Sequence, residues 1–334
     1  MTKVKIITFE EHTIDKGIAA GSSKITEEVF PNFRHMNNPL MTAVPEFEAL
    51  TGLNAGRIED MNINGITKQI LSISNQPQLL APEEAIPLCQ KSNDRLNEAV
   101  QAHPDRFAAF AALPWSDPEA AAVELERTVT ELNFKGTLIV GRPSVDAVFL
   151  DDKRYWPVLG KAAQLKVPVY VHPGFPHPDI QKDYYSGFSD LVDTSFSLYG
   201  WGWHAEAGIQ LIRMILSGVF DKYPDLQLIA GHWGEMVPFY LDRLDMAMPK
   251  SITGLSKTIP EYFREHIYVT PSGMFSYPQL KYIMEVIGVD RILYSVDYPY
   301  VKQEGAADFL INAPISDEDK EKIAHGNAEK LLKL

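Results

Sequence analysis

Short runs of β-branched and other apolar residues alternate along the chain with longer segments whose apolar residues recur every three or four positions. The first pattern predicts buried strands and the second predicts amphipathic helices. Eight runs of the strand type occur, at 4–9, 69–73, 107–113, 136–140, 167–172, 226–232, 267–270 and 291–297. Helical periodicity is found between them, as at 83–102, 119–132, 155–165 and 209–217. This alternation is typical of βα units and a parallel sheet.

Eight strands separated by helices favour an α/β fold in which a (β/α)₈ TIM barrel spans residues 1–334 as one domain. The competing fold is a doubly wound open sheet, which needs a glycine-rich phosphate turn after its first strand. No such turn follows the first run, where the chain reads Glu-Glu-His at 10–12. We therefore expect a barrel with long loops after strands 1 and 5, at roughly 13–44 and 174–205.

The second long loop is rich in aromatic residues. They are Tyr184, Tyr185, Phe188, Phe196, Tyr199, Trp201 and Trp203. Such a segment suits a lid or a wall for a flat ring, and it suits an interface between subunits equally well. His177 and His204 lie on or beside it, and we assign them no function.

The composition limits the kinds of partner. The 44 acidic residues outnumber the 31 basic ones, for a formal charge of −13 and a pI near 5.2. This excess argues against nucleic acid and favours a small-molecule partner. No stretch approaches ~18 consecutive apolar residues, and the run at 4–9 begins without a signal-peptide pattern, so we expect a cytoplasmic protein without membrane contact. The single cysteine, Cys89, excludes an intrachain disulfide, and we expect it in the core.

Five side chains with metal-binding chemistry stand near the ends of predicted strands. Glu10 and His12 are two positions apart, so they project together from one side of a strand, while the glutamate between them faces the helices. His172, His232 and Asp297 close three later apolar runs. The carboxyl ends of barrel strands meet at one mouth, where residues far apart in sequence can bind one ion. Carboxylate and imidazole ligands suit Zn²⁺ or Mn²⁺.

Two further side chains near His232 are candidates for the site. Glu235 stands three residues after it, close enough to orient an imidazole through a hydrogen bond. The competing interpretation of Glu235 is a solvent carboxylate near the start of a helix. Arg243, eight residues further along, would anchor a substrate carboxylate or pair with an acidic neighbour.

Motifs along nearly the whole chain resemble those of the amidohydrolase superfamily. They are Phe9-Glu10-Glu11-His12, Asn93-Asp94, Pro104-Asp105-Arg106-Phe107 leading to Leu113-Pro114, Val171-His172-Pro173, Gly231-His232-Trp233-Gly234-Glu235 and Ser295-Val296-Asp297-Tyr298-Pro299. The branch that they resemble is that of the metal-dependent decarboxylases typified by amino-carboxymuconate-semialdehyde decarboxylase. Within it, the Glu-Glu-His opening resembles γ-resorcylate and 2,3-dihydroxybenzoate decarboxylases, whereas relatives with other substrates commonly open His-x-His or Asp-x-His.

This resemblance implies an amidohydrolase-type barrel that binds one divalent ion, Zn²⁺ or Mn²⁺ with Mg²⁺ also compatible, and that assembles as a homodimer or homotetramer. The metal ligands that it implies are Glu10, His12, His172 and Asp297. His232 would lie in or beside the metal shell and contact the substrate, as would Arg243, which matches the family's arginine on the following helix. Strand four carries no lysine at its carboxyl end, so a two-metal centre built on a carbamylated lysine is not expected. After His172 the chain departs from the family and reads Pro-Gly-Phe-Pro-His-Pro, which leaves the substrate's ring pattern open.

The implied activity is that of a carbon–carbon lyase that decarboxylates a hydroxylated aromatic acid, such as 2,6- or 2,3-dihydroxybenzoate, without oxidation. The metal would chelate the substrate's carboxylate and ortho oxygen, while Asp297, protonated in the complex, donates a proton to the ring carbon. His232 and Glu235 would position Asp297 and tune its pKa, which must lie above its ordinary value of ~3.9. A metal-bound water is the alternative proton source.

Two other functions use the same residues. A metal-dependent hydrolase would attack a lactone or amide with a metal-bound water and Asp297 as general base. Its product would be an opened ring or a cleaved amide instead of CO₂. A binding or scaffolding protein without turnover is the third interpretation, and the intact set of five candidate ligands argues against it.

Overall fold

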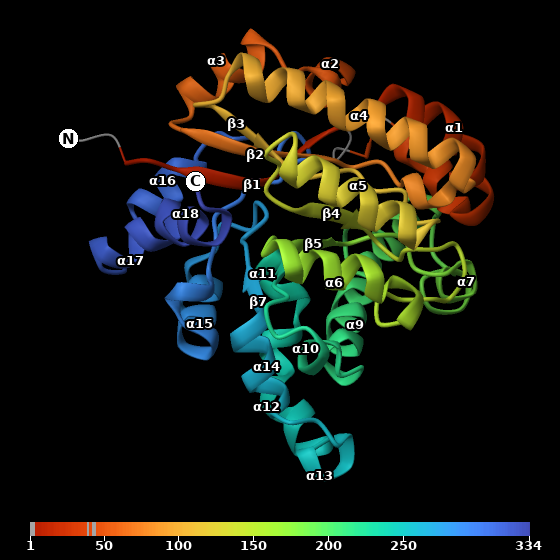
Figure 1. Cartoon of the computed structure of the whole chain (residues 1–334), viewed down its shortest axis with the longest axis vertical. Helices are drawn as coiled ribbons and strands as arrows, with labels where there is room; N and C mark the ends of the chain where they lie inside the picture. The colour runs from red at the N-terminus through yellow and green to blue at the C-terminus, as the bar shows by residue number, and fades with distance from the viewer. Residues whose placement is uncertain (1–3, 39, 42–44) are drawn as a thin grey trace.

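Parallel strands at the centre of the molecule form the wall of a barrel (Figure 1). The computed structural model of the chain describes residues 4–38, 40–41 and 45–334. Its strands are β1 (Ile7–Thr13), β2 (Lys68–Ile73), β3 (Phe107–Ala109), β4 (Thr137–Val140), β5 (Val169–His172), β6 (Leu228–Ala230) and β7 (Ile267–Val269). They pair in the orders β1-β2-β3 and β4-β5-β6-β7, and each neighbouring pair is parallel. The predicted α/β fold with a parallel sheet is confirmed.

Three isolated bridges join the two sheets into a closed ring. They pair Ala111 with Thr137, Val269 with Ile292, and Phe9 with Ser295. The eighth strand, expected at 291–297, is therefore present only as residues 292–297, which make single bridges to β7 and β1. We call these residues the closing segment. Asp297, at the end of this segment, has a φ of 69°, and β1 is itself irregular between Thr8 and Glu11 in its pairing with β2.

Helices surround the ring (Figure 1). In α4 the buried residues Ala85, Cys89 and Leu96 recur at helical spacing, so one face of the helix packs inward. The helices are α1 (Lys16–Val29), α2 (Phe47–Thr51), α3 (Ala55–Ile63), α4 (Pro82–Ala102), α5 (Pro118–Thr130), α6 (Trp156–Leu165), α7 (Pro178–Tyr184), α8 (Asp190–Ser197), α9 (Gly202–Leu216), α10 (Val219–Lys222), α11 (His232–Glu235), α12 (Val237–Ala247), α13 (Lys250–Thr253), α14 (Ile259–His266), α15 (Tyr277–Ile287), α16 (Ala306–Ile311), α17 (Asp317–Glu321) and α18 (Asn327–Leu332). The four predicted helices correspond to α4, α5, α6 and the second half of α9.

The inside of the barrel is filled with side chains. Members of this inner cluster are Ile7, Phe9, Ile70, Phe110, Leu138, Tyr170, Ile229 and Leu293. Helix α18 adds Ala328 and Leu332 to the same cluster. Its neighbour Leu331 lines a shallow pocket with Val167, which precedes β5, so α18 closes the amino-terminal end of the barrel. Side chains that function in chemistry are therefore expected at the opposite end.

The two long loops fold into helices. The first, predicted at 13–44, contains α1 and a 3₁₀ helix, Pro31–Asn37, while its residues 39 and 42–44 lie outside the described part. The second contains α7, α8 and the start of α9. Phe30 of the first loop stacks on Phe175 of the second, with ring centroids 4.2 Å apart. We call residues 16–37 and 174–203 together the cover.

Hydropathy separates these helices from membrane spans. Among the helices that the structure describes, none is both long enough and apolar enough to cross a bilayer.

Candidate metal centre

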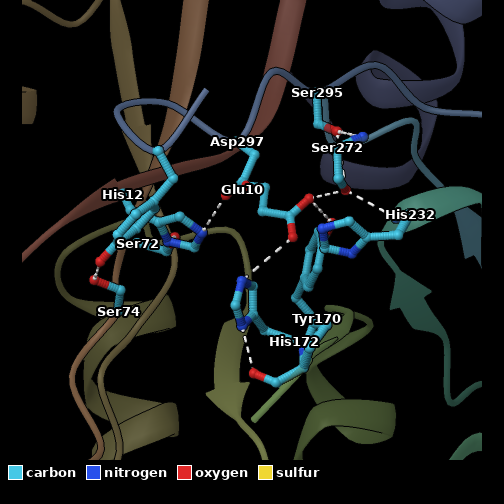
Figure 2. Close-up of polar contacts among 12 residues, drawn as sticks. Glu10, His12, Ser72, Ser74, Tyr170, His172, His232, Ser272, Ser295 and Asp297 are labelled. Carbon is cyan, nitrogen blue, oxygen red and sulfur yellow. Dashed lines mark hydrogen bonds and ion pairs between the residues drawn. The ribbon is translucent and has the colours of Figure 1, made fainter. Parts of the chain in front are cut away.

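Four of the predicted ligands come together at the carboxyl ends of the strands. Glu10, His12, His172 and Asp297 each offer one ligand atom, and these atoms lie within 4.8 Å of one another. His12 Nε2 lies 3.3 Å from Asp297 Oδ1, and His172 Nε2 lies 3.4 Å from Glu10 Oε1. Figure 2 shows the four side chains, from β1, β5 and the closing segment, pointing toward one another.

The two imidazoles are oriented by contacts at their other ring nitrogen. His12 Nδ1 lies 3.1 Å from the hydroxyl of Ser72, and His172 Nδ1 donates to the carbonyl of Pro173 at 2.7 Å. Both Nε2 atoms therefore face the cluster. Burial lowers the pKa of His12 to about 4 and that of His172 well below its ordinary value. Both rings are neutral near pH 7, as a metal ligand must be.

Glu10 is held in the same manner, through one of its two oxygens. Its Oε2 accepts a hydrogen bond from the Tyr170 hydroxyl at 2.6 Å and another from the Ser272 hydroxyl (Figure 2). Its Oε1 is left facing His172. The backbone of Glu10 has a φ of 60°, a left-handed conformation that costs a non-glycine residue about 1–3 kcal/mol.

The free atoms of this cluster fit a cation. Glu10 Oε1, His12 Nε2 and Asp297 Oδ1 are buried without a hydrogen-bond partner among the described residues. Unpaired buried polar atoms are costly, so three of them converging on one point indicate a bound group. Burial also raises the pKa of Glu10 and of Asp297 to about 7. A divalent ion would favour the ionised form of both carboxyls, and two carboxylates with two imidazoles suit Mn²⁺ or Zn²⁺.

His232 and Glu235 lie beside this cluster in a turn that follows β6. His232 Nδ1 is 2.8 Å from Glu235 Oε1, and the His232 ring centroid is 6.4 Å from that of His172. Burial lowers the pKa of His232, but Glu235, Glu10 and Asp297 outweigh it and raise the value to about 10. Burial conversely raises the pKa of Glu235, but His232 and His204 outweigh it and lower the value. The pair is thus a cation and an anion near pH 7.

His204 belongs to this arrangement, although we assigned it no function from the sequence. Its Nδ1 lies 2.9 Å from Glu235 Oε2 and its Nε2 lies 2.9 Å from the carbonyl of Tyr199 in the cover. Glu235 therefore lies between two histidines. The spacing along the chain carries no signal for this contact, because α9 brings His204 to the site from a loop.

Sequence reasoning also missed the supports of Glu10. Tyr170 precedes His172 by two positions, so it shares that side of β5, and this signal was available. Ser272 follows the predicted strand at 267–270, in the same place where other strands carry ligands. Both contacts fix which oxygen of Glu10 faces the cluster.

Arg243 lies apart from these residues in the single chain. It is on the exposed side of α12, and within the described residues no hydrogen bond or ion pair joins it to another side chain. Of the aromatic residues of the cover, Trp203 faces His172 with ring centroids 6.3 Å apart, whereas Tyr184, Phe188 and Trp201 are exposed. The predicted substrate contact of Arg243 thus stays a prediction.

Comparison with known proteins gives a family match over most of the chain. A family model described as amidohydrolase matches residues 55–334. A γ-resorcylate decarboxylase of Polaromonas sp. (strain JS666) is 38% identical over 304 residues, which cover 87% of this chain and 90% of that protein. The likeness therefore extends through the barrel and its loops.

Solved structures of decarboxylases are also similar to this chain over almost its whole length. The dihydroxybenzoic acid decarboxylase of Polaromonas sp. JS666, with bound manganese and the inhibitor 2-nitroresorcinol, has a TM-score of 0.85 at 33% identity over 99% of this chain and 97% of its own. The 5-carboxyvanillate decarboxylase of Novosphingobium aromaticivorans, complexed with manganese and 4-hydroxy-3-methoxy-5-nitrobenzoic acid, has a TM-score of 0.89 at 30% identity over 99% and 96%.

Proposed function

We propose the following function for this chain, which belongs to the amidohydrolase family. The chain is a metal-dependent carboxy-lyase that removes CO₂ from a hydroxylated aromatic acid, such as 2,6- or 2,3-dihydroxybenzoate. The observation that carries the proposal is the convergence of three unpaired buried ligand atoms, from Glu10, His12 and Asp297, at the barrel mouth. The relatives named decarboxylases support the same reaction.

The metal ligands in this proposal are Glu10, His12, His172 and Asp297, around one divalent ion. Manganese in the related structures supports Mn²⁺, and the donor set also suits Zn²⁺ or Mg²⁺. When bound, the ion would chelate the substrate's carboxylate and ortho oxygen and offset their negative charge. The support of Glu10 by Tyr170 and of His12 by Ser72 holds these ligands before the substrate arrives.

Asp297 is the proton donor of the proposed reaction. Decarboxylation requires a new C–H bond at the ring carbon that bears the carboxylate; the C–C bond then breaks, its electron pair returns to the ring, and CO₂ leaves. Burial raises the pKa of Asp297 to about 7 in the metal-free protein. A bound ion would favour the ionised form of this carboxyl, so in the complex the negative charge of the substrate's carboxylate must restore its proton before the transfer. Solvent then returns the proton to Asp297, whose side chain is 15% exposed.

His232 and Glu235 orient the donor and the substrate. His232 carries positive charge near pH 7 because Glu235 stabilises it, and a cation beside the cluster attracts the substrate's carboxylate. Glu235 fixes the direction of the His232 ring, and His204 fixes Glu235. Neither Glu235 nor His204 needs to touch the substrate for this purpose.

The test is metal analysis of the purified protein together with a CO₂-release assay on 2,6- and 2,3-dihydroxybenzoate. We expect one divalent ion per chain and release of CO₂, and a loss of about 10²–10⁴-fold in rate for Asp297→Asn, the range for removal of a general acid. Metal without release of CO₂ from either acid would leave the site intact and direct the search to lactones and other carboxylates. An Asp297→Asn variant of parental activity would refute this proton donor.

The predicted substrate contact and assembly complete the proposal. Arg243 would bind the substrate's carboxylate, so Arg243→Met should raise KM and leave the metal content unchanged. A homodimer or homotetramer would cover the exposed aromatic residues of the cover, such as Phe188 and Trp201. Light scattering of the purified protein measures this assembly directly.

A further inference from the structure

The proposed ligands lie on both sides of a sparsely bonded junction in the barrel wall. β1 carries two of them, and the closing segment carries Asp297. Among the described residues a single bridge, Phe9 with Ser295, joins these two segments. One more backbone hydrogen bond, from His12 N to Tyr298 O at 2.6 Å, lies beyond it. Backbone pairing alone therefore provides few contacts to set the separation of the ligands across this junction.

The buried carboxyl group of one residue spans the junction. Glu11 stands between two proposed ligands in sequence, is 0% exposed and is not part of the metal cluster. Its Oε1 accepts a hydrogen bond from Val296 N at 3.1 Å, and its Oε2 accepts one from Gln69 Nε2 at 3.1 Å. Val296 directly precedes Asp297, so Glu11 of β1 holds the backbone from which that ligand projects.

A buried arginine completes the contact from the helix side. Arg57 comes from α3 and is 3% exposed. Its Nη1 donates to the carbonyl of His12 at 2.8 Å, and its Nε donates to Gln69 Oε1 at 2.7 Å. The guanidinium also lies 4.8 Å from the ring centre of Tyr298, the residue after Asp297. Gln69 thus links the carboxyl group of Glu11 to the guanidinium of Arg57.

These hydrogen bonds join side chains to the backbone of the segments that carry the proposed ligands. Glu11 binds the amide next to Asp297, and Arg57 binds the carbonyl of His12. Glu11 and Arg57 are linked through Gln69, and the cost of desolvating buried charged groups makes such groups a poor source of stability. By contrast, substitution of a residue that hydrogen-bonds to a metal ligand commonly changes the affinity for the metal.

We propose that Glu11, Gln69 and Arg57 form a positioning network that sets the separation of Asp297 from Glu10 and His12, and thereby the affinity and geometry of the metal centre. The inference rests on the metal centre of the proposed function. It assigns the second glutamate of the Glu-Glu-His opening to the alignment of the ligands and not to metal binding.

The test compares Glu11→Gln and Arg57→Met with a matched control. Glu124 is another buried carboxylate, 3% exposed, that accepts hydrogen bonds from an amide, Asn93 Nδ2 at 2.7 Å, and from Arg127 Nη2 at 2.8 Å. It belongs to α5, on the outside of the barrel. Glu124→Gln therefore makes the same chemical change away from the metal centre.

The measurements are Mn²⁺ affinity by calorimetric titration, the electron paramagnetic resonance spectrum of bound Mn²⁺, and the melting temperature of each metal-free protein. We expect Glu11→Gln and Arg57→Met to weaken Mn²⁺ binding by about tenfold to a hundredfold and to broaden the spectrum. Glu124→Gln should keep the parental affinity and spectrum, even where its melting temperature falls as far.

The outcomes separate this inference from the metal centre itself. A folded Glu11→Gln protein with parental affinity and spectrum overturns the positioning network while the metal centre stands. If Glu11→Gln fails to fold, the double variant Glu11→Gln/Arg57→Met, which buries no unpaired charge, is measured instead, and parental affinity there also overturns it. A parent protein that binds no Mn²⁺, Zn²⁺ or Mg²⁺ overturns the metal centre and the network together.

Discussion

Three of the four side chains at the proposed metal centre are held through one polar atom while another faces the cluster. Tyr170 holds one oxygen of Glu10, Ser72 contacts one nitrogen of His12, and the carbonyl of Pro173 accepts from His172. The ligand types were predictable, because carboxylates and imidazoles at strand ends have few other uses in concert. Their partners were harder to predict, because a hydroxyl such as that of Ser272 carries no sequence signal distinct from an ordinary turn.

Metal affinity should depend on pH through Glu10 and Asp297. Burial raises the pKa of each to about 7 in the metal-free protein, so below pH 7 protons compete with the metal for both carboxyls. Affinity for Mn²⁺ should therefore rise as pH increases from 5.5 to 7, by about tenfold per pH unit for each proton released, and level off above that. His12, with a pKa of about 4, adds no dependence in this range.

Calorimetric titration in buffers of different ionisation enthalpy measures both the affinity and the number of protons released. An affinity that stays constant from pH 5.5 to 8, without proton release, would contradict the assignment of these two carboxyls as ligands.

Gly231 should tolerate no side chain, because a Cβ there would lie 2.9 Å from Glu10 Oε1 and 2.8 Å from Ser272 Oγ. Gly231→Ala should displace Glu10 and weaken Mn²⁺ binding by about tenfold or more, with the barrel still folded. Gly326→Ala is the control, since its Cβ would meet the nearest atom, Glu321 O, at 3.5 Å. Equal metal affinity in the two variants would show that Glu10 Oε1 does not face the ion.

At the scale of elements, the pattern of apolar runs predicted the order of strands and helices, since burial on one face is a property of the local sequence. The closing segment was predicted less well: single bridges replace a strand there, and its pairing depends on the other end of the ring, which the local sequence does not specify. Likewise, α9 carries His204 to the site from the second long loop, and loop length alone does not specify that approach.

The cover should loosen when its central aromatic contact is removed. Phe175 stacks on Phe30 at 4.2 Å and contacts Trp203 at 6.2 Å, so Phe175→Ala should speed amide hydrogen exchange in α1 and α8 and raise KM for the aromatic acid. Phe309→Ala is the control: Phe309 is as buried as Phe175 but packs on Tyr277, away from the cover. Unchanged exchange in α1 and α8 of Phe175→Ala would refute the linkage of the two loops.

In the whole molecule, bridges between the first and last strand segments close the ring. Side chains of α18 fill its amino-terminal end. The proposed metal ligands lie on both sides of this closure, because they come from β1, β5 and the closing segment. A bound ion therefore adds its binding free energy to the stability of the closed ring. One barrel domain over residues 1–334 remains a prediction.

Removal of metal should lower the melting temperature of the entire barrel. Mn²⁺ at a hundred times its dissociation constant stabilises a folded protein by about 2.7 kcal/mol, which corresponds to a shift of several degrees. Calorimetric scans with a chelator and with added Mn²⁺ measure the shift. His12→Ala, which lacks one proposed ligand, should show little change between the two conditions; a parental shift in that variant would contradict its role.

The junction between β1 and the closing segment also has a consequence for synthesis in the cell. Glu10 precedes Asp297 by 287 positions in the chain, so it leaves the ribosome well before Asp297 does. The ligand set is therefore incomplete on every nascent chain until the closing segment has emerged and paired with β1. Metal loading of the proposed four-ligand centre then follows synthesis of the closing segment, and a polypeptide terminated before Asp297 lacks one of the four proposed ligands, whatever the supply of ions.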